Sequence, residues 1–586
     1  MPFQDILQSL SLDRAWQHLE TITTDIPSRL AGSENARRMA EYADAEQRAA
    51  GLASRTTTFP GLVSFPEPAV LRILEPEPLD IEAFTLAQSQ TAALDGELID
   101  LGPAGWADYA GQDVRGKIVL AELPYAPARH EKALIAWRAG ARGLITANWG
   151  DEQCEAIAFG SIKSPWGNPT PEALERDMPQ LPAASISRRD GLRLQRMCAS
   201  GPVRVHLATR AENGWRPVTM TSGEIDAGTS EFLLVGGHMD SWFGPQATDN
   251  AAGSACILEL ARVFQRAASR GELRRGLHTG FWMAHETGTM ISSTRYADVH
   301  WDRLRRDCVG YLQIDQPGIA ETSVFQLHST EDLREWLTRV TSETLGNMPL
   351  RWGRQSKNGD SSFFGVGLSC LAGLLSFTHE EIAATALANL GWYHHSIHNT
   401  LDRVAPDRLE LCLRVYARWI WELLTLPVLP IQQAPVAAAL LARLNECAAQ
   451  PIDDIDMAGA VERARAYAGL ATRLDAAADL ARQLPPGSEQ EQRATHLNAA
   501  MLATSRVLVP LASTVVGAYG QDRYGHAWQR NVIPALTPWA AVAGADRDSE
   551  AFATGWVELV RARNRVVDAL DAASSIAERA MAPLAT

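Results

Sequence analysis

The sequence predicts an α/β protein: a mostly parallel, mixed sheet with helices on both faces, extended by an inserted β-rich α/β domain and a C-terminal helical domain. Three observations lead to this expectation. Apolar, strand-like runs alternate with helical periods over 216–426, short runs broken by prolines open the segment 59–215, and Ala-rich helical periods dominate 427–586. A chain of 586 residues is also long enough for about three or four domains.

The composition is that of an ordinary globular protein. Hydrophobic residues make up 46% of the chain, charged residues 21%, and the net charge is −15. This negative charge disfavours nucleic acid or an anionic membrane as a partner. No apolar run reaches the roughly 18 residues of a membrane span, and no basic segment followed by an apolar run opens the chain, so we expect a cytoplasmic protein without a membrane partner. The seven cysteines are scattered singly, which favours buried free thiols.

The first part of the chain divides at about residue 58. Apolar residues recur at helical spacing between 13 and 52, which predicts two helices joined by a turn. Frequent prolines from residue 60 to 78 then favour strands and turns. A strand at 116–122, a helix at 131–140 and a strand at 143–148 form one βαβ unit. We therefore expect a domain inserted over 59–215, between the two parts, 1–58 and 216–426, of a discontinuous domain.

The second part alternates regularly. Strands are expected at 231–235, 276–283, 308–314 and 368–377, and helices at 251–267, 293–298, 331–345 and 406–424. Beyond residue 427, helices are expected at 437–449, 458–484, 489–511 and 550–580, with prolines at 485 and 486 between two of them. These helices predict a separate helical domain over 427–586.

Polar side chains follow the predicted strands. Histidines also cluster, with nine of the fourteen between 238 and 398. Since ligands bind at the carboxyl ends of the strands in open α/β sheets, residues just after each strand are the candidates for a binding site. His238 and Asp240 follow one strand, on the same side of an extended chain, so that Asp240 can orient His238. The other candidates at such positions are Asp249, before a helix, His285 and Glu286, Asp315, and His395, in the loop before the last helix of this domain.

Two imidazoles and three carboxylates suit a pair of divalent cations. His238, Asp249, Glu286, Asp315 and His395 supply this set. Two cations held about 3.5 to 4 Å apart by a bridging carboxylate acidify a shared water and polarise a carbonyl. The sequence therefore predicts a hydrolytic centre with two divalent cations, for which the family resemblance described next favours zinc.

Several motifs give this centre a family context. The chain resembles the zinc aminopeptidase and glutamate carboxypeptidase family of co-catalytic metallopeptidases. The likeness covers about residues 1–425 and lies in RLAGSE (30–35), GGHMDSWFGPQATDNAAGSACILELAR (236–262), FWMAHETGTMISSTRYAD (281–298), YLQID (311–315), GDSSFFGVGL (359–368) and HSIHNTLDRV (395–404).

The resemblance implies more than the residues alone. It implies that His238, Asp249 and Asp315 hold one metal, and that Asp249 bridges to a second metal held by Glu286 and His395. It implies that 59–215 is a protease-associated domain. It also implies a homodimer formed through the helical tail, because glutamate carboxypeptidase and transferrin receptor share this three-part layout.

Position 285 departs from the family. Active members have a glutamate there, which takes a proton from the attacking water, whereas this chain has His285. An imidazole can do the same work, and it can also mark a lost activity. A swap, with His285 as the metal ligand and Glu286 as the base, stays open, although the Glu286-Thr-Gly pattern resembles the ligand motif of the family.

Further departures and candidates concern the substrate. His394 stands where the glutamate carboxypeptidase branch has an oxyanion-stabilising tyrosine, so His394 is expected to donate to the oxyanion or to support a ligand, and Asn399 replaces an Asp found in many relatives. Trp242 is a candidate pocket residue, with the core as the alternative. Arg351, Arg354 and Lys357 are candidates for pairing a substrate carboxylate, with a solvated loop as the alternative.

The predicted function is hydrolysis of an amide or peptide bond in a small peptide or an N-acyl amino acid. A water bridging two metals is the expected nucleophile, with His285 handling its proton. A non-catalytic receptor or scaffold of the transferrin receptor type is one alternative. An acyl-transfer or cyclising enzyme of the same fold is another. The sequence leaves open whether the free amine or the free carboxylate of the substrate is recognised.

Overall fold

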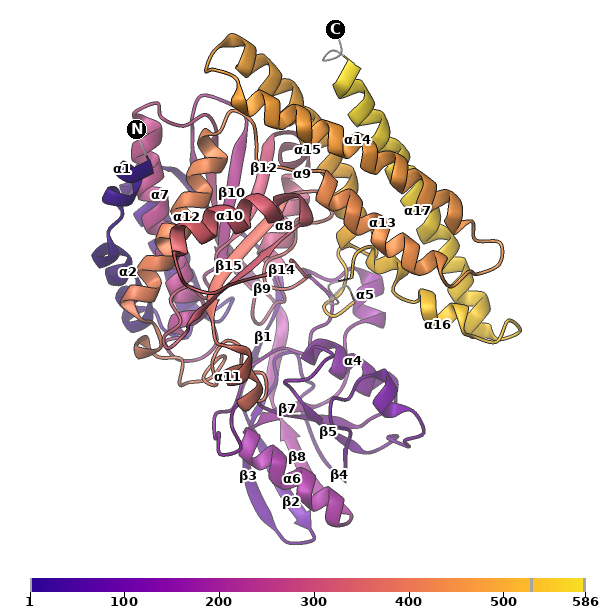
Figure 1. Cartoon of the computed structure of the whole chain (residues 1–586). Helices are drawn as coiled ribbons and strands as arrows, with labels where there is room; N and C mark the ends of the chain where they lie inside the picture. Colours follow the sequence, from indigo (N-terminus) through magenta and orange to yellow (C-terminus); the bar gives the residue numbers. More distant parts are fainter. Residues whose placement is uncertain (1–2, 527–530, 583–586) are drawn as a thin grey trace.

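The computed structural model describes residues 3–526 and 531–582 (Figure 1). The predicted domains at 1–58 and 427–586 include residues 1–2, 527–530 and 583–586, which lie outside this description. Across the described helices, none combines the length and the apolar character that a membrane crossing requires.

An eight-stranded mixed sheet forms the centre of the molecule. Its strand order is β1-β9-β11-β10-β12-β15-β13-β14. The middle strands, β11 (Gly276–Trp282), β10 (Phe232–His238), β12 (Cys308–Gln313) and β15 (Cys370–Ser376), are parallel neighbours. Strand β9 is antiparallel to β1 and β11, and β13 is antiparallel to β15 but parallel to β14. The α/β fold class with a mostly parallel, mixed sheet is thus confirmed.

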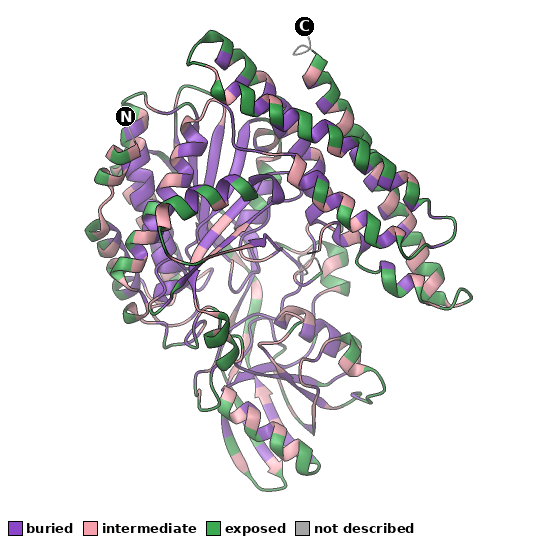
Figure 2. Cartoon of the chain, viewed as in Figure 1, coloured by how far each residue is buried: buried purple, intermediate pink, exposed green. Residues whose placement is uncertain are grey.

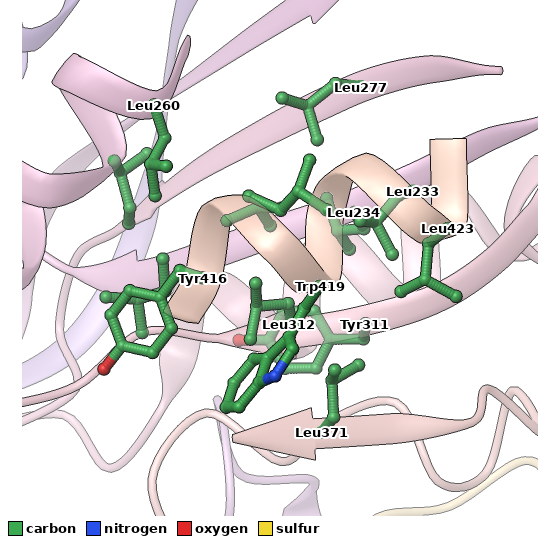
Figure 3. Close-up of a cluster of buried hydrophobic side chains, with 14 of the residues drawn as sticks. Leu233, Leu234, Leu260, Leu277, Tyr311, Leu312, Leu371, Tyr416, Trp419 and Leu423 are labelled. Atoms are coloured by element: carbon green, nitrogen blue, oxygen red, sulfur yellow. The ribbon is translucent and has the colours of Figure 1, made fainter. Parts of the chain in front are cut away.

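Helices cover both faces of this sheet. Helices α7 (Ala252–Ser269) and α12 (Pro406–Thr425) contact β10 on one face, while α8 (Ile291–Val299) and α9 (Trp301–Asp307) contact β11 and β12. Figure 3 shows Trp419 and Leu423 of α12 against Leu233 and Leu312 of the sheet, and all four side chains are buried. Strands β10, β11 and β12 at the centre of the sheet are buried along their length (Figure 2), so their near-continuous apolar runs are explained by cover on both sides.

The inserted segment forms a closed barrel of seven strands, in the order β2-β3-β7-β6-β5-β4-β8. These strands run from β2 (Pro68–Glu75) to β8 (Val203–Thr209), through β3 (Leu79–Thr85), β4 (Ala92–Asp100), β5 (Ile118–Glu122), β6 (Gly143–Ala147) and β7 (Ala183–Ile186). Helices α4 (Arg129–Arg138), α5 (Pro171–Arg176) and α6 (Arg188–Ser200) accompany them. The predicted strand–helix–strand unit corresponds to β5, α4 and β6.

Two long strands join the barrel to the central sheet. Strands β1 (Ala53–Pro66) and β9 (Ala211–Ile225) pair antiparallel along their whole length, from Ala53 opposite Glu224 to Pro66 opposite Ala211. The boundaries expected at 58/59 and 215/216 therefore fall inside continuous strands instead of loops. A paired ribbon transmits position better than two free linkers, which fixes the barrel relative to the sheet (Figure 1).

The remaining helices lie at the two ends of the chain. Helices α1 (Phe3–Ser9), α2 (Leu12–Asp25) and α3 (Glu34–Ala49) pack near α7 and α12. The C-terminal region consists of α13 (Ala434–Ala448), α14 (Met457–Gln483), α15 (Ser488–Ser513), α16 (Trp539–Ala543) and α17 (Glu550–Met581), which share a second apolar core. This confirms the predicted helical character of the region.

Two strands on the far side of β15 were not expected from the sequence. Strand β13 (Val324–Ser329) and the edge strand β14 (Leu350–Arg354) extend the sheet beyond β15, and α10 (Arg334–Leu345) connects them. Strand β14 is short and alternates Arg with Trp and Gly, a pattern with too few apolar residues to stand out. A short helix, α11 (His379–Ala384), follows β15.

The helical region is attached to the sheet domain through a buried arginine. Arg506 of α15 is 6% exposed and donates hydrogen bonds to the carbonyls of Leu304, Arg305, Gly367 and Cys308. Replacing it would leave several buried carbonyls without donors.

We expect Arg506→Met to lower the free energy of unfolding by about 3 kcal/mol, because a buried acceptor left without its partner costs about 1–3 kcal/mol. Urea denaturation followed by circular dichroism measures this change. Arg493→Met on the same helix is the matched control, since Arg493 forms only an exposed ion pair with Glu489, and its effect should be small. Equal effects of the two substitutions would contradict the assigned role of Arg506.

Candidate metal centre

The five predicted ligands meet at the carboxyl edge of the central strands. His238 is the last residue of β10, Glu286 and Asp315 follow β11 and β12, and Asp249 and His395 lie in the loops before α7 and α12. Because β10, β11 and β12 are parallel, their ends meet at the same edge. The structure thus brings together residues that lie up to 157 positions apart, His238 and His395.

The separations within this group are those of ligands around shared ions. The His238 Nε2 atom lies 3.0 Å from an oxygen of Asp249 and 3.4 Å from an oxygen of Asp315. The His395 Nε2 atom lies 3.1 Å from the other oxygen of Asp249 and 3.3 Å from Glu286. Asp249 therefore has one oxygen facing each imidazole, which is the geometry of a bridging carboxylate.

Buried polar atoms without hydrogen-bond partners test whether these residues fit metal ions. Among the described residues, His238 Nε2, Asp249 Oδ2, Glu286 Oε1 and Asp315 Oδ1 are buried and make no hydrogen bond of adequate geometry. Such atoms are rare in folded proteins, because each one costs free energy unless something satisfies it. Four of them converging on one point, all imidazole nitrogens or carboxylate oxygens, fit divalent cations of the zinc type.

Electrostatics within the group point the same way. Burial disfavours the charged His238 imidazole, but Asp315 and Asp249 outweigh burial and raise its pKa well above the usual range. Burial likewise opposes charge on His395, whereas Glu286 and Asp249 raise its pKa to about 9. For Asp249, contacts with His238 and His395 outweigh burial and hold the pKa well below its usual range. Without metal, protons on the imidazoles thus compensate the clustered carboxylates.

Local sequence explains how the ligands are held. The Asn250 amide donates to the Ile314 carbonyl at 3.0 Å and accepts from the Gln316 backbone at 3.1 Å, which ties the Asp249 loop to the Asp315 loop. Asn399 accepts from the backbone of Thr248 at 3.0 Å. The departure at 399 therefore keeps a contact that fixes the loop of the bridging residue.

Asp240 does not act as expected. The Nδ1 atom of His238 lies 3.0 Å from the backbone carbonyl of Asp240, while the Asp240 carboxylate is 3.7 Å away. That carboxylate instead accepts hydrogen bonds from the backbone N–H groups of His285 and Glu286, at 3.2 and 3.0 Å. The prediction that the carboxylate of Asp240 orients His238 is wrong, because the main chain does so and the carboxylate holds the neighbouring loop.

Two further histidines border the ligand group. The ring of His285 stacks on that of His238 with centroids 3.9 Å apart, and one nitrogen of each lies within 4.8 Å of an Asp315 oxygen. The Nδ1 atom of His394 lies 3.2 Å from Asp249 and lacks a hydrogen-bond partner among the described residues. Burial and the neighbouring His395 lower the His394 pKa well below its usual range, so this imidazole is neutral. The geometry leaves the swap of His285 into the ligand set open.

A cavity of about 510 Å³ opens beside the ligands and is bounded by all three parts of the chain. Asp249, His285 and Asp315 form its floor. The inserted domain contributes residues 123–130 and Trp149, and the C-terminal region contributes Tyr524. The insert also reaches His395 directly, because the Phe159 N–H donates to the His395 carbonyl at 2.7 Å.

The predicted substrate residues do not line this cavity. Arg354 is buried in an ion pair with Glu331, Arg351 contacts His379 and the Phe377 carbonyl, and Lys357 is buried against Trp166 and Gln521. Trp242 is buried beside the His395 ring. These four assignments are corrected: β14 and the loop after it turn the three cations toward other partners, and Trp242 belongs to the core.

Sequence reasoning missed three residues near the cavity. Arg129 and His130 begin a helix of the inserted domain, and Tyr524 lies in the C-terminal region, where its ring stacks on His130 at 3.9 Å. Their only sequence signal was polar or aromatic character in predicted loops and helices of other domains, and nothing in their spacing relates them to the strand ends.

The sheet and its edge cluster define a metallopeptidase-type α/β domain. Residues 220–420 match the model of peptidase family M28, and residues 91–194 match that of the PA domain. The chain thus contains a peptidase family M28 domain and a PA domain, as the resemblance implied.

Individual proteins agree with this assignment. Leucine aminopeptidase 2 of Arthroderma otae is 31% identical over 216 residues, which cover 36% of this chain and 39% of that protein. Carboxypeptidase Q of Mus musculus is 23% identical over 69% of this chain and 84% of that protein. A zinc aminopeptidase from Bacillus subtilis shares the fold, with a TM-score of 0.54 at 19% identity over 71% of this chain and 96% of that chain. The chain thus spans about two fifths of the length of the leucine aminopeptidase relative.

We expect zinc binding to release protons. Since the raised pKa values keep His238 and His395 protonated in the metal-free protein at pH 7, both must lose a proton before they coordinate. Affinity should therefore rise with pH at least up to about 9, the pKa of His395. Calorimetric titration of metal-free protein with zinc, in two buffers of different ionisation enthalpy, counts the protons.

His395→Ala should lower the bound zinc measured by elemental analysis. His398→Ala, an exposed histidine of the same loop, is the control and should leave it unchanged. Absence of zinc from the wild-type protein after supplementation would contradict the metal centre.

Proposed function

We propose that this chain is a metal-dependent hydrolase that cleaves an amide or peptide bond in a small peptide or N-acyl amino acid. The observation that supports this most is the convergence of unsatisfied ligand atoms beside a cavity of substrate size, whose lining includes Asp249 and Asp315. In this proposal His238, Asp249 and Asp315 hold one ion, and Asp249, Glu286 and His395 hold the other. Two bound zinc ions would supply an acidified bridging water and polarise the scissile carbonyl.

The residues of the chain then have separate tasks. His285 takes one proton from the attacking water as its oxygen adds to the carbonyl carbon, and passes that proton to the leaving nitrogen as the C–N bond breaks. The products are one carboxylic acid and one amine, so atoms and charge balance. His394, whose Nδ1 faces Asp249 without a hydrogen bond, donates from Nε2–H to the oxyanion that develops on the carbonyl, and it does so as the neutral tautomer protonated at Nε2.

A buried cation in the cavity wall favours substrates with a free carboxylate. Arg129 is 9% exposed, and its guanidinium donates only to the carbonyls of Phe159 and Ser161, at 3.2 and 3.3 Å. Among the described residues, it pairs with no carboxylate. Burial lowers its pKa to about 10, which leaves it charged at neutral pH. A carboxylate of the substrate would supply the missing counter-charge.

The cavity lining also contains side chains that suit an apolar group. Leu123, Pro124, Leu387 and Leu390 belong to its lining. A substrate with an apolar acyl or amino-terminal side chain, followed by an amino acid with a free carboxylate, would meet both kinds of wall. We therefore favour carboxy-terminal over amino-terminal recognition. The homodimer formed through 427–586 and the cytoplasmic location stay predictions.

The activity is tested with zinc-loaded protein on a panel of dipeptides, aminoacyl anilides and N-acyl amino acids, with products identified by mass spectrometry. We expect hydrolysis of N-acyl amino acids or dipeptides, and loss of at least about 1,000-fold in kcat for Asp249→Asn, which removes the bridge. Cleavage of no substrate by metal-loaded protein would contradict the proposal and favour the receptor-like alternative. A cyclised product without oxygen from labelled water would favour the cyclase alternative.

Arg129→Gln should lower kcat/KM for substrates with a free carboxylate by about 10- to 100-fold, since a hydrogen bond to a charged group is worth about 1.5–3 kcal/mol. The same substrates with an amidated carboxyl terminus should change little. Arg138→Gln, at the other end of α4, is the control, because Arg138 pairs with Asp177 on the surface. An equal loss on acidic and amidated substrates would contradict carboxylate recognition.

A further inference from the structure

A buried aspartate pairs with the histidine at the catalytic position. We propose that Asp360 is a positioning residue for His285, so that the two side chains form an imidazole–carboxylate pair in place of a single carboxylate base. This inference rests on the proposed function, because it assigns a partner to the residue that handles the proton there. Asp360 lies in the loop between β14 and β15, 75 positions after His285 in the sequence.

The contact is direct and enclosed. His285 Nδ1 lies 3.0 Å from Asp360 Oδ2, and Asp360 is 1% exposed. A carboxylate can only accept, so the hydrogen-bonded Nδ1 carries a proton. The neutral imidazole then has its lone pair on Nε2, which is the form that can accept a proton from water. The Asp360 carboxylate thus selects the tautomer of His285 that can act as a base.

Further hydrogen bonds hold the carboxylate in place. Ser293 of α8 donates to Asp360 Oδ1 at 2.7 Å, and its hydroxyl lies 2.9 Å from that of Ser362. The indole of Trp166, from the inserted segment, donates to Ser362 at 2.9 Å. The stacking of the His285 ring on His238 limits rotation from the other side. A base held on two sides keeps its geometry without reorganising during the reaction.

The pair is electrostatically better matched than two acids at these positions would be. A glutamate there would place a second carboxylate beside the buried Asp360. Two like charges at hydrogen-bond distance in a dry site are mutually destabilising, and one of them would have to hold a proton. Histidine at 285 and aspartate at 360 are therefore a matched choice, and changing one of them should alter the effect of changing the other.

Kinetics of zinc-loaded variants test the pairing. Asp360→Asn should lower kcat by about 10- to 100-fold, which is the usual effect of removing such an orienting partner, with KM changed less than about twofold. The same substitution should cause no further loss in a His285→Gln background, because Asp360 acts only through His285. A loss of the same size in both backgrounds would show a general structural role and overturn the inference.

Stability of the metal-free protein gives a readout that does not depend on activity. Asp360→Asn should lower the thermal unfolding midpoint of the wild-type chain and raise it in a His285→Glu background, where it removes carboxylate repulsion. Asp332→Asn is the matched control, since Asp332 is equally buried and accepts from Thr330, Ser369 and Ser505, away from the site. Its effect on the midpoint should be the same in both backgrounds.

The two measurements separate failure of the inference from failure of the proposed function. If no substrate is cleaved but the sign of the Asp360→Asn effect on the midpoint reverses with residue 285, the hydrolase proposal fails and the pairing stands. If the midpoint changes by the same amount in both backgrounds, the pairing is overturned whatever the activity.

Discussion

The concentration of ionisable groups beneath one cavity is the constraint on which the rest of the structure depends. His238, Asp249 and Glu286 are almost fully buried, and Asp315 and His395 are mostly so. Carboxylates in a dry environment need a nearby positive charge, because solvation by water is lost. In the metal-free state this charge comes from protonated imidazoles, and divalent cations would replace those protons. A fold that could not supply either would not tolerate these residues in its interior.

In this architecture, rigid strands carry the predicted ligands, and separate elements enclose the cavity above them. Parallel strands end at a common edge, so His238, Glu286 and Asp315 converge without long loops. The cover comes from the barrel, which the β1–β9 ribbon fixes to the sheet, and from the C-terminal helices, which Arg506 fixes to it. The cavity wall is therefore made of parts that the sequence places in three different regions. Water exclusion and substrate recognition depend on how those parts are joined.

The sequence predicted which residues meet at the sheet edge better than it predicted their surroundings, for a physical reason. Each ligand follows an apolar strand, and strand ends can be located from local periodicity. Arg129 follows a different strand in a different domain, so its approach to the site depends on how the domains dock, which no local pattern encodes. Arg351 and Arg354 were misplaced because β14 is a short edge strand with a weak pattern, and its pairing with β13 turns these side chains away from the cavity. The role of Asp240 was misjudged because a side chain and its own carbonyl are equivalent candidates in sequence.

Under the proposed function, position 285 would replace a carboxylate base by a histidine and still keep the local charge. A glutamate base brings one negative charge to the edge of the metal site. In the proposed mechanism His285 would be neutral when it accepts the proton, and its pair with an ionised Asp360 would bring the same charge one side chain further from the metal ligands. Attraction between bound cations and that charge would be weaker at the longer distance, while the basic nitrogen would stay beside the cavity. The proton acceptor would then be an imidazole whose orientation depends on Ser293 of α8 and Trp166 of the inserted domain.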